Sequence, residues 1–553
     1  MMSSPVADAT GWSCGRCSFG NSAAMPQCEV CEAPRCQTAN GAVAVSGTGN
    51  ANVDLFVSSC RGVKRERVEE LVEAAVEEDL LTTMKTLAYV RDSRGGRGER
   101  EIGRWMMAAL AKKPKLAPQL AANLEALVEL GRWDDLVAVT GTELEEQAVA
   151  LFAKQLLADK AALGAGEAGE AGAKVGEAEG TARKSSVSLV AKWFPSEGRS
   201  VDRKLKLASK VAKVLGVDKA GLRKQFLSPL RAHLELVETK MCKGQFDAID
   251  FSHVPSLCMK MHSQPGKAFP NRCAEKFGQW KQDLAAGRNG AKVNASQLFA
   301  HQVVEGYWGG GYGAGATEVD PVLEKSWEQQ QAQARELGSL GKMVVVSDVS
   351  GSMHGTPMMV SIAMGILVSD VLPEPWRSHV ITFEDRPQWH RVAGETLCEK
   401  VASLRDAPWG GSTNLQGVFD LVLQKAAQAR LPADEMPERV LIVSDMEFDQ
   451  ACRDNSQTNL ARIQASYRAA GYECPKLIFW NVNGRTEQYP ALCDEKDVSL
   501  ISGFSASALK AVMGEEVSPY LTMMEALSSK RYDPIRLVDS DANPAAEAES
   551  KAQ

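Results

Sequence analysis

One stretch limits the fold of this chain more than any other: an apolar run that ends abruptly in a carboxylate and two hydroxyls. The run, residues 343–346, is short and β-prone, which is typical of a strand buried on both faces of a parallel sheet. Asp348, Ser350 and Ser352 follow it, and Gly351 allows the backbone to turn tightly between them. Open α/β sheets bind their ligands at the carboxyl ends of such strands. The sequence therefore predicts a ligand site with three oxygen-bearing side chains at this edge of a sheet.

Two later stretches supply further oxygen ligands for the same site. Thr413 lies on the Gly-rich loop 409–414, and Asp445 ends a second apolar strand. Carboxylates and hydroxyls are hard ligands, which suit Mg²⁺ or Mn²⁺ rather than zinc. Asp-x-Ser-x-Ser after an apolar strand resembles the metal-ion-dependent adhesion site of von Willebrand factor A (vWA) domains. That resemblance implies a metal site completed by Thr413 and Asp445, in which an acidic residue of a partner protein fills the free position.

The Asp-x-Ser-x-Ser motif has two other interpretations. Asp348 can cap the following helix while the two serines serve only the turn, as is common between a strand and a helix. A phosphatase of the haloacid-dehalogenase type also carries an Asp after an apolar strand. Its motif needs a second Asp where Ser350 stands, so this sequence lacks the general acid of that family.

The pattern around this motif favours a doubly wound, Rossmann-like α/β domain over residues 339–535, which is the vWA-like domain of the resemblance. Predicted strands at residues 378–383, 439–444, 476–482 and 498–501 alternate with helical stretches at residues 395–405, 415–430, 458–470 and 505–514. The segment 536–553, rich in Asp, Ala and Glu, is expected to be disordered.

The N-terminal segment 8–37 carries two Cys-x-x-Cys pairs, Cys14 with Cys17 and Cys28 with Cys31. Two such pairs can hold one tetrahedral, structural Zn²⁺, whose binding energy folds a segment too small for a core. The segment resembles the Ran-binding-protein-2 type zinc finger, whose members bind single-stranded RNA or ubiquitin. Ser18, Phe19 and Val30 nearly match the ubiquitin-binding pattern. A protein-binding finger is therefore expected, and a purely structural finger is the alternative.

The sequence between the finger and the sheet is predicted to be a solenoid-like helical domain over residues 53–305, preceded by a linker at 38–52. Apolar residues recur at helical spacing there, with short breaks. An Ala/Gly/Glu-rich segment, about 161–182, is predicted to be a disordered insertion. A Gly-rich linker and one helix, residues 306–338, lead into the sheet.

Basic residues suggest an RNA-binding surface on the helical domain. One group is the Arg-Gly-rich turn after residue 90, and the other is a basic helix in segment 203–213. The candidate RNA contacts are Arg91, Arg94, Arg97, Arg203, Lys204, Lys206, Lys210 and Lys213. The alternatives are an Arg-Gly turn whose arginines cap carbonyls and pair with nearby acids, and a solvated charged helix face.

Short motifs in the same region carry a second resemblance. The Arg-Gly turn, Gly131–Leu136 and Lys192–Pro195 resemble an uncharacterised eukaryotic family that joins a helical region to a vWA-like domain. That domain order is similar to the TROVE proteins of the Ro autoantigen type, which bind small structured RNAs. The resemblance implies RNA as an alternative partner.

Composition limits the remaining possibilities. The 553-residue chain has a net charge of −7 and no apolar run of membrane-spanning length, so no membrane partner is expected. Its scattered cysteines and the absence of a visible signal peptide predict a cytoplasmic or nuclear protein. No nucleophile–base pair, phosphate loop or open zinc site is visible, so no enzyme is expected. The predicted function is a metal-dependent protein-interaction scaffold, and the alternative is a TROVE-like RNA-binding component.

Overall fold

The fold is taken from a computed structural model of the chain. It describes residues 12–13, 20–21, 45–170, 187–309, 318–336, 338, 340–383, 386–407, 413–448 and 459–538. Near the N-terminus, β1 (Trp12–Ser13) pairs antiparallel with β2 (Gly20–Asn21). The four cysteines predicted to bind zinc, together with Ser18, Phe19 and Val30, lie outside the described residues.

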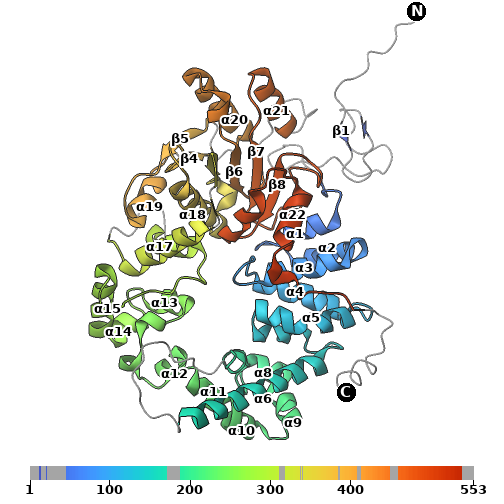
Figure 1. The fold of residues 1–553 in the computed structure, drawn as a ribbon, viewed down its shortest axis with the longest axis vertical. Helices are drawn as coiled ribbons and strands as arrows, with labels where there is room; N and C mark the ends of the chain where they lie inside the picture. Colours follow the sequence, from blue (N-terminus) through green and yellow to red (C-terminus); the bar gives the residue numbers. More distant parts are fainter. Residues whose placement is uncertain are drawn as a thin grey trace, which may run out of the picture.

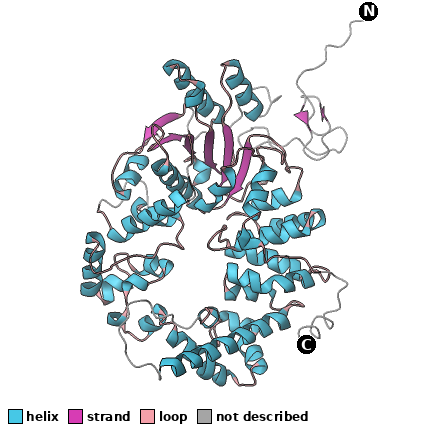
Figure 2. Cartoon of the chain, viewed as in Figure 1, coloured by secondary structure: helices cyan, strands magenta, loops and turns pink. Residues whose placement is uncertain are grey.

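A helical region precedes the main sheet, as the sequence predicts (Figure 2). Its first part comprises α1 (Ala51–Ser58), α2 (Arg65–Glu78), α3 (Leu80–Arg91), α4 (Arg100–Ala111), α5 (Ala117–Leu130), η1 (Trp133–Val139) and α6 (Glu145–Glu170). Its middle part comprises α7 (Val190–Trp193), α8 (Ser200–Leu205), α9 (Leu207–Val214), α10 (Lys219–Leu222), α11 (Ser228–His233) and α12 (Val237–Cys242). Its last part comprises α13 (Ser256–His262), α14 (Ala268–Arg272), α15 (Ala274–Ala286), α16 (Ala300–Trp308) and α17 (Pro321–Glu336).

Local sequence explains where these helices begin and which face they bury. In α2, Val68, Leu71, Val72 and Ala75 recur at helical spacing and all are buried. The Asp79 carboxylate, at the junction with α3, accepts hydrogen bonds from the backbone N–H groups of the next helix and so caps it. These helices are therefore held mainly by one apolar stripe each, packed against their neighbours.

The sheet contains six strands in the order β5-β4-β3-β6-β7-β8. They are β3 (Met343–Ser347), β4 (His379–Thr382), β5 (Gln388–Arg391), β6 (Arg439–Ser444), β7 (Lys476–Asn481) and β8 (Val498–Ser502). All neighbouring pairs are parallel except β4 and β5. Every residue of β3 and β6 is buried, which confirms the sequence expectation of central strands covered on both faces.

Helices cover both faces of the sheet. One face packs against α20 (Leu415–Ala429), α21 (Asn459–Ala469) and α22 (Pro519–Leu527). The other packs against α18 (Thr356–Val371), α19 (Leu397–Arg405) and the short helix η7 (Ala506–Val512). The sequence predicted the positions of most of these elements but missed β5 and α22.

The helical region forms an arc, and both ends of the arc contact the sheet domain (Figure 1). At one end, α1 packs against β8 and α3 packs against α22. At the other, α16 and α17 pack against α18. The chain therefore follows a closed path in which the sheet domain joins the first and the last helices.

Four predicted segments differ at their edges from the contacts and elements that the structure describes. Val45 and Thr48, in the predicted linker, form backbone hydrogen bonds with Tyr489 and Cys493 of the sheet domain. The helix α6 extends to residue 170, into the predicted disordered insertion, of which residues 171–182 lie outside the described residues. The helix α16 runs through Gly306 into the predicted Gly-rich linker, because the missing Cβ leaves room for Leu323.

The fourth boundary concerns the C-terminal segment. Residues 536–538 of the predicted tail are held on α5, where Arg536 and Val538 exchange backbone hydrogen bonds with Asn123 and Gln119. Residues 539–553 lie outside the described residues. Across the described part of the chain, no helix is long and apolar enough to cross a membrane.

Candidate functional site

The carboxyl ends of β3 and β6 bring two carboxylates together at the centre of the sheet. The two strands pair in register, with Ser347 opposite Val443, so Asp348 and Asp445 leave neighbouring strands at the same edge. Asp348 is fully buried, and Asp445 is 2% exposed. The hydroxyl of Ser444 donates to Asp348 Oδ2 at 2.5 Å, which fixes the carboxylate between the strands.

The serines of the turn join this pair. The backbone N–H of Ser350 donates to Asp348 Oδ1 at 2.9 Å, so the turn itself is pinned by the aspartate. The hydroxyls of Ser350 and Ser352 lie 3.2 Å apart. Ser350 is buried, whereas Ser352 is exposed at the first turn of the short helix Gly351–Met353. The site therefore has a buried floor of carboxylates and an exposed hydroxyl at its rim.

Thr413 approaches from the loop before α20. Its side chain is fully buried, and its hydroxyl donates to the backbone oxygen of Glu447 at 2.6 Å. Glu447 stands two residues after Asp445, and Met446 between them has a positive φ of 68°. A non-glycine residue in this region is strained, and such strain is frequent at functional sites. All five residues predicted as metal ligands thus lie at one edge of the sheet, and the structure links Thr413 to the loop that carries Asp445.

The electrostatics of the site favour a cation. Burial raises the pKa of Asp348 to about 6, and the neighbouring Asp445 carboxylate adds to that rise. Burial also raises the pKa of Asp445, although a hydrogen bond from Ser352 opposes it. Within the described residues, no lysine or arginine pairs with either carboxylate. Buried carboxylates without a basic partner are costly unless a metal ion or a proton neutralises them, so this donor set fits Mg²⁺ or Mn²⁺.

The site has two carboxylates, and its other candidate ligands are hydroxyls. In the described part of the chain, no three His, Cys, Asp or Glu side chains gather where they could hold a metal. Sequence reasoning missed Ser444 and Thr486, whose hydroxyls donate hydrogen bonds to Asp348 and Asp445. Thr486 donates to the Asp445 backbone oxygen at 2.7 Å, from the loop after β7. The sequence held one sign that Ser444 belongs to the site: it is a hydroxyl residue directly after the apolar run 440–443.

In the Arg-Gly turn, two of the three predicted RNA contacts are buried and serve the packing of the protein. Arg91 is 2% exposed and donates to Asp135 Oδ2 at 2.6 Å. Arg97 is 1% exposed, donates to the backbone oxygens of Phe56 and Ser59, and lies with its guanidinium carbon 4.4 Å from the Phe56 ring centroid. Because neither guanidinium reaches the surface, Arg91 and Arg97 are wrong as RNA contacts. The alternative interpretation of this turn fits both residues: Arg91 pairs with an acidic side chain, and Arg97 bonds to backbone carbonyls.

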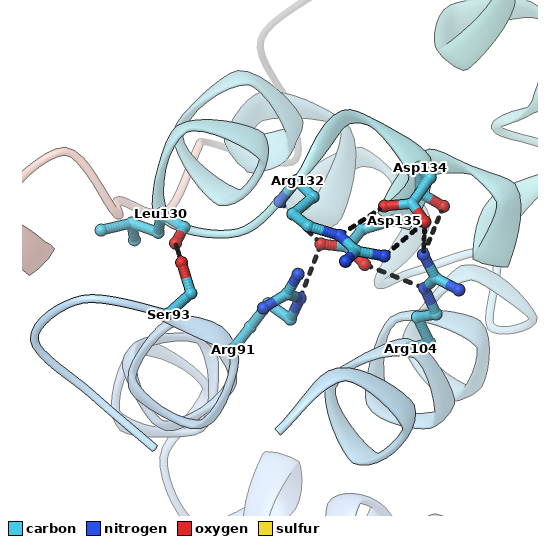
Figure 3. A network of polar contacts seen from close by, with 7 residues as sticks. All are labelled: Arg91, Ser93, Arg104, Leu130, Arg132, Asp134 and Asp135. Carbon is cyan, nitrogen blue, oxygen red and sulfur yellow. Dashed lines mark hydrogen bonds and ion pairs between the residues drawn. The ribbon is translucent and has the colours of Figure 1, made fainter. Parts of the chain in front are cut away.

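Figure 3 shows the network around Arg91, which joins three segments. Arg104 of α4 donates to Asp135 Oδ1 at 2.9 Å, and Arg132 pairs with Asp134 at 2.6 Å. The guanidinium of Arg132 also lies 3.9 Å from the centroid of the Trp193 ring. The Gly131–Leu136 and Lys192–Pro195 motifs therefore meet each other, and both serve the packing of the helical region.

The remaining basic candidates are mostly exposed. The predicted single helix is two helices, α8 and α9, separated at Lys206, which has a left-handed φ of 54°. Lys210 pairs with Glu145 of α6 at 2.5 Å. Arg94 of the Arg-Gly turn is exposed, as are the other four basic residues of this segment: Arg203, Lys204, Lys206 and Lys213.

Comparisons with known proteins match almost the whole chain. Residues 38–148 and 143–340 match the family model described as domain of unknown function DUF2828. Residues 342–546 match another, described as domain of unknown function DUF7788. The second match begins one residue before β3, so the family boundary coincides with the start of the sheet. The uncharacterised protein L728 of Acanthamoeba polyphaga mimivirus is 32% identical to this chain, in a match covering 92% of this chain and 91% of L728.

Proposed function

The chain belongs to the family defined by the domain of unknown function DUF2828, and we propose that it is a non-enzymatic, metal-dependent protein-interaction scaffold. In this proposal the sheet domain is vWA-like, and Asp348, Ser350, Ser352, Thr413 and Asp445 form an adhesion site for Mg²⁺ or Mn²⁺. The single observation that carries it is the pair of buried carboxylates, Asp348 and Asp445, with three hydroxyls at one sheet edge and no basic partner among the described residues.

The arrangement suits capture of a partner more than hydrolysis. Mg²⁺ prefers six oxygen ligands and tends to keep water molecules. Ser350, Ser352 and Thr413 would hold the ion directly, and the two aspartates would hold it directly or through water. An acidic side chain of a partner then fills a remaining position, close to the exposed hydroxyl of Ser352. The partner we propose is therefore a protein that presents an Asp or Glu.

The N-terminal finger completes the proposed scaffold. The spacing of Cys14, Cys17, Cys28 and Cys31 supports a structural Zn²⁺. Ubiquitin is the partner we propose for it, through Ser18, Phe19 and Val30. A pull-down with immobilised ubiquitin should retain the full-length protein and should not retain a Phe19→Ala variant. Equal retention of the two proteins would remove ubiquitin from the proposal.

The adhesion site has a direct test in the thermal stability of the full-length protein. We expect Mn²⁺ or Mg²⁺ to raise the melting temperature of the wild type, because a ligand that binds only the folded state stabilises it, by about 2.7 kcal/mol at one hundred times its Kd. Asp348→Asn should abolish this rise. It should leave the metal-free protein at least as stable, because it removes one of two buried carboxylates.

The control is Asp406→Asn, which changes an exposed aspartate at the end of α19. Its melting temperature should respond to metal as the wild type does. A metal-induced rise that survives in Asp348→Asn would disprove the adhesion site.

RNA binding is a second candidate, supported by the exposed basic residues of α8 and α9. Such binding should weaken steeply with salt, because each phosphate contact releases counterions. A reversal of charge at Lys204 and Lys213 should then abolish it. RNA binding that is indifferent to salt and to these changes would exclude this surface.

A further inference from the structure

A cavity of about 580 Å³ lies where the two ends of the helical arc meet the sheet domain. Its wall is built from four segments that are far apart in the sequence. They are the loop 93–98 between α3 and α4, the segment 296–300 that leads into α16, the end of α17, and the segment 504–510 after β8. The cavity therefore exists only when the arc is closed on the sheet, and it is separate from the carboxylate pair at β3 and β6.

The wall is predominantly positive. The side chains of Arg94 and Lys510 are exposed, and neither forms an ion pair or a hydrogen bond with another described residue. Arg97 also lines the wall, but it is 1% exposed and its Nη1 atom donates to the backbone oxygens of Phe56 and Ser59, so it is not counted as a cation open to the ligand. Glu336 is the carboxylate among the lining residues. Two unpaired cations that face one cavity favour an anionic ligand.

Hydroxyl and backbone groups are suited to the same ligand. The hydroxyls of Ser505 and Ser507 lie 2.7 Å apart, and that of Ser507 donates to the backbone oxygen of Gly96 at 3.2 Å. This bond ties the sheet segment to the α3–α4 loop, so two walls of the cavity are held together before a ligand enters. The N-terminus of α16, a nine-residue helix, also lies at the wall. The positive end of its dipole favours a phosphate there, although the backbone N–H groups of Phe299 and Gln302 are already hydrogen-bonded within the helix start.

An aromatic ring lines the same cavity. Phe299 is half-buried, stacks on His301 with ring centroids 5.7 Å apart, and has the Arg61 guanidinium 5.1 Å from its own centroid. His301, Arg61 and the edge-on ring of Phe504 hold the Phe299 ring in place, and the part of Phe299 that lines the cavity offers an apolar contact for a flat heterocycle. The volume of the cavity lies within the usual range of 300 to about 1,000 Å³ for small-molecule sites.

We propose that this cavity binds a free nucleotide, with its phosphates at Arg94 and Lys510 and its base beside Phe299. The limited volume and the two unpaired cations favour a small ligand over an RNA chain, which needs a longer basic surface. This inference does not depend on the proposed adhesion site, because none of the five oxygen ligands lines the cavity.

The test is a calorimetric titration of the full-length protein with AMP and with ATP, in EDTA so that the adhesion site holds no metal. We expect saturable binding that weakens at least tenfold in an Arg94→Ala/Lys510→Ala double variant. The matched control, Arg100→Ala/Lys530→Ala, removes two exposed cations that do not line the cavity. Its affinity should stay within twofold of the wild type.

Two further variants test where the base binds and whether the cavity is independent of the adhesion site. Phe299→Leu should weaken AMP binding while leaving the competition by inorganic pyrophosphate unchanged, because only the base contacts the ring. Asp348→Asn should leave nucleotide affinity unchanged, which separates this site from the adhesion site. Three results would overturn the proposal: no nucleotide binding at millimolar concentration, undiminished binding by the double variant, or binding of a single-stranded RNA decamer with none of either nucleotide.

Discussion

Arg91 shows how a charged residue is kept in the core of the helical region. Its guanidinium is held by Asp135, which also accepts from Arg104 and from the backbone N–H of Arg132. A Cβ on Gly131 would lie 3.0 Å from Arg91 Cγ and 2.6 Å from the Asp135 carboxylate, so glycine is needed there. A buried ion pair of this kind adds little net stability compared with an apolar core, but it is costly to break.

The first prediction at this scale concerns the loss of Arg91. Replacement by Met leaves part of a buried anion uncompensated, so we expect Arg91→Met to lower the free energy of unfolding by about 3 kcal/mol. Arg94→Met, in the same turn, changes an exposed residue and should stay within about 0.5 kcal/mol of the wild type. Urea denaturation followed by circular dichroism measures both. Coincident unfolding curves for the two variants would contradict this role of Arg91.

The second prediction concerns His301, which is 2% exposed. Burial, helped by the nearby charges of Arg61 and Lys260, lowers the pKa of its imidazole to about 3. The unfolded chain, with an ordinary histidine pKa near 6.5, therefore binds a proton that the folded protein excludes between these two pH values. The free energy of unfolding should consequently fall as the pH drops from about 6.5 towards 3, by about 1.4 kcal/mol per pH unit from this group.

The measurement is the melting temperature between pH 4 and pH 7. His301→Gln should show a shallower decline towards acid than the wild type. His253→Gln alters an exposed histidine paired with Asp250 and serves as the control. A slope unchanged by His301→Gln would show that other groups carry the acid sensitivity.

At the scale of elements, the loop between α3 and α4 is held by backbone hydrogen bonds and by a close approach at Gly96. The backbone N–H groups of Arg97 and Glu99 donate to the carbonyls of Tyr89 and Val90, which folds the loop back onto its own helix. A Cβ on Gly96 would lie 2.0 Å from the Tyr89 backbone oxygen. The loop can therefore hold its shape at the cavity only with glycine at this position.

A pair of glycine variants tests this constraint. Gly96→Ala must displace the loop, and we expect it to lower the free energy of unfolding by about 2 kcal/mol. Gly278 lies in α15 with open space around its missing Cβ, so Gly278→Ala should stabilise the protein by about 0.5–1 kcal/mol. Thermal unfolding of each variant shows whether its stability falls or rises relative to the wild type. Stabilisation by Gly96→Ala would disprove the close approach of the two backbones.

On the scale of the whole molecule, the C-terminal segment fastens the sheet domain to the first helices. Arg531 forms two hydrogen bonds with the buried Asp92, and its hydrogen bonds to that carboxylate raise its own pKa. Asn123 and Gln119 then pair with the backbone of residues 536–538. The apolar core of the first helices is continuous with one face of the sheet. The two regions should therefore unfold together.

Truncation separates the contribution of these last residues. A chain ending at residue 538 keeps the four hydrogen bonds to α5 and serves as the reference. A chain ending at residue 535 loses four hydrogen bonds to α5, at about 0.5–1.5 kcal/mol each, and should be less stable by at least about 2 kcal/mol. Differential scanning calorimetry compares the two chains. Equal stability of the two chains would show that the hydrogen bonds of residues 536–538 do not stabilise the fold.

The sequence by itself determined the features that depend on neighbours along the chain. Apolar runs gave the buried strands β3, β6 and β7, and helical spacing gave most helices, because one repeating face must be buried in each case. The carboxylate and hydroxyls after β3 and β6 could be expected at one edge, because parallel strands end together. The short, half-exposed strand β5 lacks such a run, and it was missed.

Only the tertiary structure decided which charged residues are buried and which segments meet. Arg91 and Arg94 stand in the same polar turn, and no local pattern distinguishes them. Their environments differ because Asp135, from a distant turn, pairs with one and leaves the other exposed. The cavity depends in the same way on contacts between residues separated by hundreds of positions, such as Gly96 with Ser507. Long-range packing chooses these partners, so the sequence read locally contains the residues of the site but not their arrangement.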